Sequence, residues 1–327
     1  MSKIIISRVP FRLSLGGGST DLPSYYEKHG GFIFGVTINL YMDVFVKEPR
    51  SDDNIHVHYK HFESVSCVHE ISHEIVKQTL LMQGVKNKIA ISFKADTPAG
   101  TGLGSSGACA VAVMKGVAAF HGKKMTNTQA ATNAFKLTRA LKLPDGVQDP
   151  YVCSLGGFVV LEINKKGKVK ALKPKIPAVT VKKFFDNSLF YYTGVVRESK
   201  QILVDQDEAK ILDLKHKTKS LGRQILECFR KGDLDCFGRL MDEHWHIKKT
   251  MSNKMSSANF DEIYKVARRA GALGGKIMGA GGGGYFMFYC PTQRIKTKVR
   301  NALNRFRMRE MDFKLDTKGA RVYVVKP

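Results

Sequence analysis

The chain has 327 residues, 43% of them hydrophobic, which is enough for about two domains with apolar cores. Lysine and arginine total 53 against 29 acidic residues, and this net charge of +24 is compatible with nucleic acid, a membrane surface or anionic small molecules as partners. Because the basic residues are scattered and only 1 tryptophan is present, the composition disfavours a nucleic-acid-binding surface.

The cysteines and apolar runs indicate a cellular compartment. The 6 cysteines are widely spaced and none forms a Cys-x-x-Cys pair, which predicts free thiols in a reducing compartment. Few apolar residues precede Ser7, too few for a signal peptide, and the apolar stretch 108–120 contains Lys115 and is too short to span a bilayer. We therefore expect a soluble cytoplasmic protein without a membrane partner.

Hydrophobic periodicity and turn residues predict the elements in chain order. Alternating and β-branched runs predict strands at 3–9, 31–38, 41–47, 56–61, 88–95 and 156–163. Apolar residues three or four positions apart predict helices at 22–30, 69–83 and 128–141, and another helix after the glycines of 100–107.

The character of the sequence changes near residue 185. Beyond it we expect mainly helix over 199–269, a strand, glycine turn and strand over 274–290, a helix from Thr292 and a last strand at 320–325. The pattern predicts an α+β protein with two domains, 1–185 and 186–327.

A glycine-rich run, Pro98–Gly107, joins a predicted strand to a predicted helix. It contains G-x-G-x-x-G, but the acid that a dinucleotide-binding fold places about 20 residues later is missing, and so is the Gly-Lys-Ser/Thr of a Walker A loop. Its glycines allow close backbone approach, and Ser105 and Ser106 stand at a helix N-terminus, which attracts phosphate. We predict a phosphate-binding loop, the alternative being a tight turn with serine caps.

A second glycine run, Gly16–Gly18, lies between a predicted strand and a predicted helix. Arg12 and Asp21 flank it and could hold a hydroxylated or anionic substrate. The alternative is that Thr20 and Asp21 only cap the helix, and the residues alone leave both readings open.

Three further segments carry residues of chemical interest. His69–His73 matches the zinc-protease pattern H-E-x-x-H but has no third ligand nearby, so we interpret it as a helix start with exposed histidines. Asp149 stands at a predicted helix start, where aspartate is a common cap, and Asp145 is interpreted as a turn residue. The glycines of Gly279–Gly284 exceed what a hairpin needs and suggest close approach to a ligand.

Together these segments resemble the GHMP small-molecule kinases, named for galactokinase, homoserine kinase, mevalonate kinase and phosphomevalonate kinase. Pro10–Arg12 with Gly16–Gly18 and Asp21 resembles the first family motif, 98–108 the second and 276–286 the third. The resemblance implies the two-domain GHMP kinase fold. In that fold the N-terminal domain is like the second domain of ribosomal protein S5, and the C-terminal domain is ferredoxin-like and carries the third glycine loop.

Within the family, four segments resemble the D-glycero-D-manno-heptose 7-phosphate kinases: 16–31, Gln148–Asp149, 193–203 and 244–249. This resemblance implies an ATP-dependent sugar kinase that phosphorylates the anomeric hydroxyl of that heptose phosphate to the 1,7-bisphosphate. The product would serve a nucleotide-activated heptose for surface polysaccharide.

The resemblance also implies roles for individual residues. Asp149 would be the catalytic aspartate with Arg12 beside it, and Ser106 would bind Mg2+. The ATP-binding residues would be Pro98, Gly100, Thr101, Gly102, Leu103, Gly104, Ser105 and Ser106. The substrate-binding residues would be Gly17, Gly18, Thr20, Asp21, Arg197, Gly281 and Gly282, with Arg197 on the substrate's phosphate.

Two positions depart from the family pattern. Some members carry a magnesium-binding acid on the helix before the catalytic loop, but 123–144 contains no acid and Thr138 stands about where it would be. We therefore expect metal ligation by Ser106, Asp149, ATP and water. Pro150 follows Asp149 where heptose kinases usually have glutamine, and proline is favourable in the first turn of a helix.

Several alternatives stay open at this point. The chain could be another sugar kinase of this family, acting on galactose, fucose or a different heptose, or a non-catalytic nucleotide or sugar sensor. The net charge motivates a nucleic-acid binder, which scattered basic residues disfavour, and the missing acid after the glycine-rich run disfavours an NAD-dependent oxidoreductase. We expect a small sugar phosphate as partner and no nucleic acid, and the sequence contains no signal for an oligomeric state.

Overall fold

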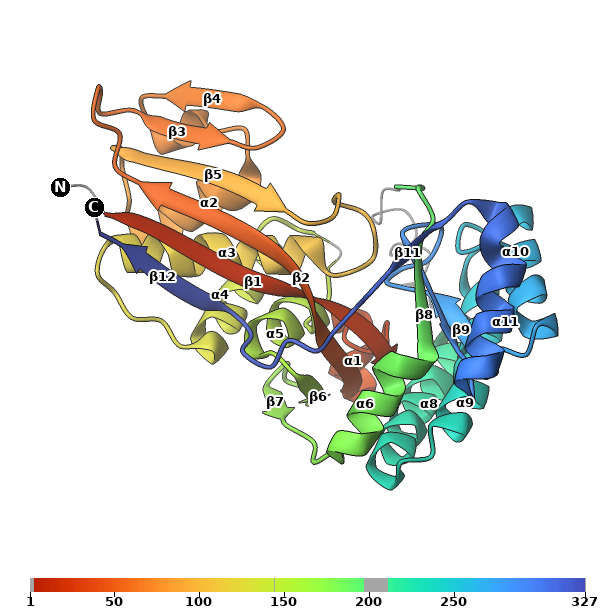
Figure 1. The fold of residues 1–327 in the computed structure, drawn as a ribbon. Helices are drawn as coiled ribbons and strands as arrows, with labels where there is room; N and C mark the ends of the chain where they lie inside the picture. Colours follow the sequence, from red (N-terminus) through yellow and green to blue (C-terminus); the bar gives the residue numbers. More distant parts are fainter. Residues whose placement is uncertain (1–2, 144, 197–210, 327) are drawn as a thin grey trace.

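The computed structural model describes residues 3–143, 145–196 and 211–326, which form two β-sheets covered by helices (Figure 1). The expected α+β class is confirmed. None of the helices in these ranges is long and apolar enough to cross a membrane.

The larger sheet is built around two long neighbouring strands, β1 and β2. Its order is β12-β1-β2-β5-β3-β4, with β6 beside β2 and β7 beside β6. The first half of β2 pairs with β6 and the second half with β5. The strands are β1 (Ile4–Gly16), β2 (Gly31–Lys47), β3 (Ile55–His58), β4 (Phe62–Val65), β5 (Ile89–Ala95), β6 (Phe158–Ile163), β7 (Val169–Leu172) and β12 (Arg321–Val325).

Helix α3 lies at the centre of the helical layer on this sheet, between the strands and helices α4 and α5 (Figure 1). It consists mostly of small and apolar residues and is buried on nearly every side, as expected for a helix enclosed by other elements. Its one lysine, Lys115, donates to the carbonyl of Met125 at 3.1 Å and to Asn127 at 2.6 Å. The helices of this layer and its edge are α1 (Pro23–His29), the 3-10 turn η1 (Val68–Glu70), α2 (Glu74–Gln83), α3 (Ser105–Phe120), α4 (Asn127–Ala140) and α5 (Gln148–Leu155).

The smaller sheet has the antiparallel order β11-β8-β10-β9. Along the chain it reads strand, helices, strand, strand, helix, strand, which is the split βαβ arrangement of a ferredoxin-like domain, as expected. Its elements are α6 (Ala178–Asn187), β8 (Ser188–Tyr192), α8 (Leu212–Lys231), α9 (Leu234–Met251), α10 (Ala258–Arg269), β9 (Gly274–Ile277), β10 (Tyr285–Tyr289), α11 (Gln293–Leu303), the turn η3 (Asn304–Phe306) and β11 (Arg309–Met311).

The two sheets share one continuous hydrophobic core. Phe229 of α8 contacts Phe34 and Phe158 of the larger sheet, with ring centroids 5.3 and 5.4 Å away. After β11 the chain returns to the larger sheet, where β12 pairs antiparallel with β1. The division into 1–185 and 186–327 stays a prediction, and the last strand shows that the chain crosses between the sheets more than once.

Candidate active site

All three glycine runs contribute residues to the lining of one cavity. Two of them touch through their backbones, because a Cβ on Gly102 would overlap the carbonyl of Met278, and a Cβ on Gly279 would overlap Gly102. Both glycines also have positive φ, 81° and 65°. Only glycine allows both the close approach and the backbone angles, so the loop from the larger sheet and the loop from the smaller sheet fit directly together.

The glycine-rich run of 98–107 turns sharply into helix α3. Gly100, Gly102 and Gly104 have φ values of 77°, 81° and 81°, in the region that favours glycine. Gly104 is the N-cap of α3 and supplies no capping side chain, while Ser105 and Ser106 line the cavity at the first turn. A helix N-terminus with backbone N–H groups left for a ligand is a favourable site for phosphate.

Arg12 forms a buried ion pair with Asp149. Its Nε and Nη2 donate to Oδ1 of Asp149 at 2.9 and 2.6 Å, and its side chain is only 4% exposed. Arg12 also binds the glycine loop, through Nη1 to the carbonyl of Gly102 at 2.7 Å and through its backbone N–H to the carbonyl of Leu103 at 3.0 Å. The β1–β2 register shifts between Pro10 and Arg12, and such irregularities re-aim side chains beside functional sites.

Gln148 extends this network on the other side of Asp149. Its Nε2 donates to Oδ1 of Asp149 at 3.2 Å, and its Oε1 accepts from Ser14 at 2.7 Å. Among the described residues, the hydrogen bonds to Asp149 all end on Oδ1. Oδ2 is therefore the oxygen left for a ligand.

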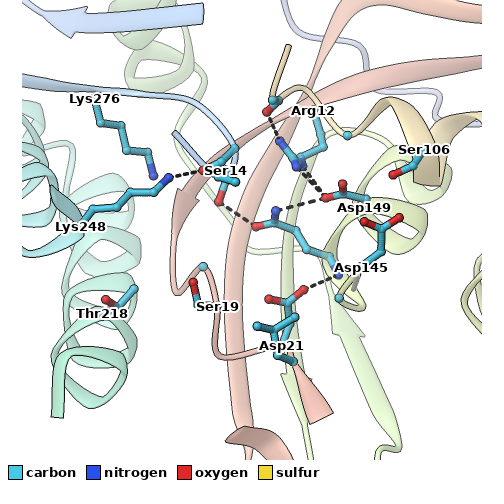
Figure 2. A pocket seen from close by; sticks show the side chains of 18 of the residues that line it. Arg12, Ser14, Ser19, Asp21, Ser106, Asp145, Asp149, Thr218, Lys248 and Lys276 are labelled. Carbon is cyan, nitrogen blue, oxygen red and sulfur yellow. Dashed lines mark hydrogen bonds and ion pairs between the residues drawn. The ribbon is translucent and has the colours of Figure 1, made fainter. Parts of the chain in front are cut away.

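Two further carboxyl groups lie beside Asp149 (Figure 2). The pKa of Asp21 is raised to about 6, mainly by burial and also by the charge of Asp149, against the opposing effect of the hydrogen bond from the Gln148 N–H at 2.9 Å. Burial likewise raises the pKa of Asp145 to about 6, with repulsion from Asp149 as the second cause and a hydrogen bond from Ser106 opposing them. Three carboxyl groups share one cavity, and their charges disfavour one another.

Ser106, Asp145 and Asp149 all line the cavity and offer oxygen atoms as metal ligands. In the described part of the chain no group of three or more His, Cys, Asp or Glu side chains could hold a metal ion. Mg2+ is usually bound by one or two carboxylates together with substrate phosphates and water, so this smaller donor set fits it. Thr138, by contrast, is buried, and its hydroxyl bonds to the carbonyl of Phe135 at 2.9 Å.

The predicted site residues divide into two groups. The residues that line the cavity are Arg12, Gly18, Asp21, Gly100, Gly102, Gly104, Ser105, Ser106 and Asp149. The others among the described residues are Gly17, Thr20, Pro98, Thr101, Leu103, Gly281 and Gly282, and they lie within or behind the loops. Arg197 lies outside the described residues.

Contacts within the loops account for the positions of the second group. The Thr20 hydroxyl lies 2.7 and 2.8 Å from the carbonyls of Gly17 and Phe32 and can donate to either, which ties Thr20 to the first glycine run and to β2. The Gly282 N–H donates to the carbonyl of Met255 at 2.8 Å. In the third glycine loop, the neighbouring residues Gly279 and Ala280 line the cavity.

Sequence reasoning missed several cavity residues. Asp145 was interpreted as a turn residue, although its position four residues before Asp149 is a usable signal. His244 and Lys248 are one helical turn apart on α9, a spacing that places both on one face, and Lys276 is a lone charge in an apolar strand. These sequence signals point to a site only when it is known that the helices and strands on which the residues lie meet in the fold.

Comparisons with known proteins cover both parts of the chain. The family described as GHMP kinases N terminal domain matches residues 66–157, and GHMP kinases C terminal matches residues 225–308. A D-glycero-alpha-D-manno-heptose 7-phosphate kinase of Campylobacter jejuni is 27% identical over 98% of each chain. An L-fucokinase/L-fucose-1-P guanylyltransferase of Bacteroides fragilis is 25% identical over 98% of this chain and 38% of its own length.

The fold has close counterparts among solved structures. The crystal structure of a D-glycero-D-manno-heptose 1-phosphate kinase from Bacteroides thetaiotaomicron has a TM-score of 0.83 at 25% identity, covering 99% of this chain and 100% of that one. The matched family ranges include the glycine-rich run of 98–107, Asp149 and the third glycine loop.

Proposed function

The chain belongs to the GHMP kinase family, and from this we propose that it transfers a phosphoryl group from Mg-ATP to the anomeric hydroxyl of D-glycero-D-manno-heptose 7-phosphate. The observation that carries the reaction type is the Arg12–Asp149 pair, held at 2.6 Å beside the phosphate loop in a polar cavity. The choice of sugar is supported by the full-length similarity to the Campylobacter jejuni heptose 7-phosphate kinase.

The proposed reaction forms a bond between the sugar oxygen and the γ-phosphorus and breaks the bond from that phosphorus to ADP. The hydroxyl proton passes to Oδ2 of Asp149, which has no hydrogen bond from the described residues, while Arg12 holds Oδ1 and fixes the carboxylate. The N-terminus of α3 binds the nucleotide phosphates. Positioning and charge placement of this kind carry most of the catalysis of phosphoryl transfer.

Mg2+ bound with the nucleotide would neutralise charge on the transferred group. We propose that Ser106 and Asp145 hold it, with Asp149 close by. Asp145 then takes the place of the acid that other family members carry on the preceding helix.

The test is ADP release by the purified protein with Mg-ATP and a panel of acceptors: the heptose 7-phosphate, sedoheptulose 7-phosphate, mannose 6-phosphate, galactose and fucose. We expect turnover on the heptose phosphate. We expect Asp149→Asn to reduce kcat by about 100-fold or more, the usual contribution of a positioned base, with Mg-ATP binding retained. Asp312→Asn is the matched control, because that side chain is 82% exposed and does not line the cavity.

Other outcomes would change the proposal in defined ways. Turnover on a different sugar would keep the mechanism and replace the substrate, and fucose is the acceptor to watch because of the Bacteroides fragilis relative. Full activity of Asp149→Asn would remove Asp149 from the mechanism.

A further inference from the structure

The cavity has a second, basic end that the proposed mechanism does not use. His244 and Lys248 of α9 and Lys276 of β9 line the same cavity as the catalytic pair. Figure 2 shows Lys248 and Lys276 on one side of Ser14, and Ser106 on the other side. The basic side chains and Ser106 at the N-terminus of α3 therefore lie on opposite sides of Ser14 in the cavity (Figure 2), and Lys248 also donates to the carbonyl of Gly279.

These three side chains are buried, at 2–8% exposure. Nδ1 of His244 has no hydrogen-bond partner among the described residues. Burial lowers the pKa of Lys276 to about 7, and the neighbouring positive charge of Arg12 lowers it too. Buried polar atoms and buried like charges cost free energy, so an anion in the cavity would be strongly favoured here.

Phosphate is the anion whose chemistry suits this end. It presents only acceptor oxygens and a compact charge, which match two lysine ammonium groups and an imidazole N–H. The phosphates of ATP already have a site at the N-terminus of α3. The second anion therefore belongs to the acceptor, whose hydroxyl must reach Asp149 between the two ends.

Building on the proposed function, we propose that His244, Lys248 and Lys276 bind the phosphate group that the sugar acceptor already carries, and thereby select sugar phosphates over neutral sugars. An acceptor without this phosphate would bring no anion to the buried Lys276 ammonium and to Nδ1 of His244. A site built around a polar group rejects analogues that lack the group much more strongly than an apolar pocket rejects a missing methylene.

The experiment compares D-glycero-D-manno-heptose 7-phosphate with the unphosphorylated heptose in wild type and Lys276→Met. Loss of one charged contact should lower kcat/KM for the heptose phosphate by about 10- to 100-fold. The KM for ATP and the rate on the neutral heptose should stay nearly unchanged. Methionine has a similar volume and removes a buried charge, so the variant is expected to fold.

Lys249→Met is the matched control. Lys249 follows Lys248 on α9, pairs with Asp261 at 3.0 Å and does not line the cavity, so all three kinetic parameters should match wild type. Equal losses on both sugars in Lys276→Met, or a raised KM for ATP instead, would overturn the assignment. Wild-type turnover confined to neutral sugars would overturn it as well.

If wild type phosphorylates neither heptose, the proposed function fails and the anion site is tested separately. With saturating Mg-ADP on the phosphate loop, inorganic phosphate should still raise the Tm of the wild type, and less so that of Lys276→Met. No rise, or equal rises in both proteins, would overturn the proposal.

Discussion

Asp145 and Asp149 show how burial and neighbouring charge act together on single residues. Burial, together with the smaller effect of the Asp149 charge, raises the pKa of Asp145 to about 6. A group with a raised carboxyl pKa binds more protons in the folded than in the unfolded protein between about pH 4 and 6. Its ionisation therefore destabilises the ligand-free fold as the pH rises through this window.

The prediction at this scale is that Asp145→Asn flattens the pH dependence of stability. In the ligand-free wild type, the free energy of unfolding should carry a contribution that falls as the pH rises from about 4 to 6, because Asp145 ionises in a buried site. The variant should lose that contribution. Its stability relative to wild type, measured by urea unfolding, should therefore be higher at pH 7 than at pH 4. An unchanged pH profile would show that Asp145 is well solvated.

Lys276 affects the pH dependence of stability in the opposite direction to Asp145. Its pKa is lowered from 10.5 to about 7 by burial and by Arg12, so its charge costs stability below about pH 7, and that cost declines as the pH rises from about 7 toward 10.5. A phosphate dianion bound beside it would reverse the preference and keep the ammonium protonated. The protonation of this lysine should therefore differ between the empty and the occupied states of the proposed anion site.

At the scale of elements, the starts of α3 and α5 are held together by glycine. A Cβ added to Gly107 would lie 2.6 Å from Cβ of Asp149 and 2.6 Å from the backbone N of Pro150. Such distances are too short for real contacts, so one of the two helices would have to move. The position of Asp149 relative to the phosphate loop depends on this contact.

We expect Gly107→Ala to reduce kcat by about 10- to 100-fold, because a shift of about 1 Å in a reacting group costs activity on that order. Alanine favours helix, so the fold should remain. Gly116→Ala on the same helix is the control, since its Cβ would lie 3.1 Å from a methyl of Val46 in β2 and Gly116 does not line the cavity. Steady-state kinetics of both variants measure the effect, and wild-type kcat in Gly107→Ala would contradict it.

Helix and strand boundaries were predicted well where the signal was local. The helix expected at 128–141 is α4, and the strand expected at 88–95 is β5. The helix expected at 69–83 begins only at Glu74, after the turn η1, because the side chain of His73 caps it by accepting from the Val76 N–H. Two separate strands expected at 31–38 and 41–47 form one strand, β2, whose halves pair with different neighbours.

At the scale of the whole molecule, an aromatic cluster joins the two sheets. Phe229 is fully buried and its ring contacts Phe34, Phe158, Phe184 and Phe237. These residues come from the larger sheet and from helices α6, α8 and α9. The cluster should make the two halves unfold together.

We predict that Phe229→Ala lowers the free energy of unfolding by about 3–5 kcal/mol, the usual cost of removing a buried aromatic ring. Unfolding should stay a single cooperative transition at a lower denaturant midpoint, followed by circular dichroism and by Trp245 fluorescence. Phe62→Ala is the control, because Phe62 is 63% exposed and its loss should change stability little. Two separate transitions, only one of them shifted, would contradict a shared core.

Local properties of the chain carry much of what was predicted. Hydrophobic periodicity predicted the α+β class. Glycine spacing before a helix start predicted a phosphate-binding loop, because backbone angles and helix ends depend on nearby residues. The resemblance to the GHMP kinases added the roles of Arg12 and Asp149, and these two residues do meet in the structure.

Long-range contacts determine the rest. Arg12 and Asp149 are 137 positions apart, and β12 reaches β1 from the other end of the chain. The burial of Asp145, and the meeting of His244 with Lys276 at one end of the cavity, follow from how α9, β9 and the glycine loops pack. No local pattern encodes these environments, because burial and electrostatic coupling exist only once distant segments have been brought together.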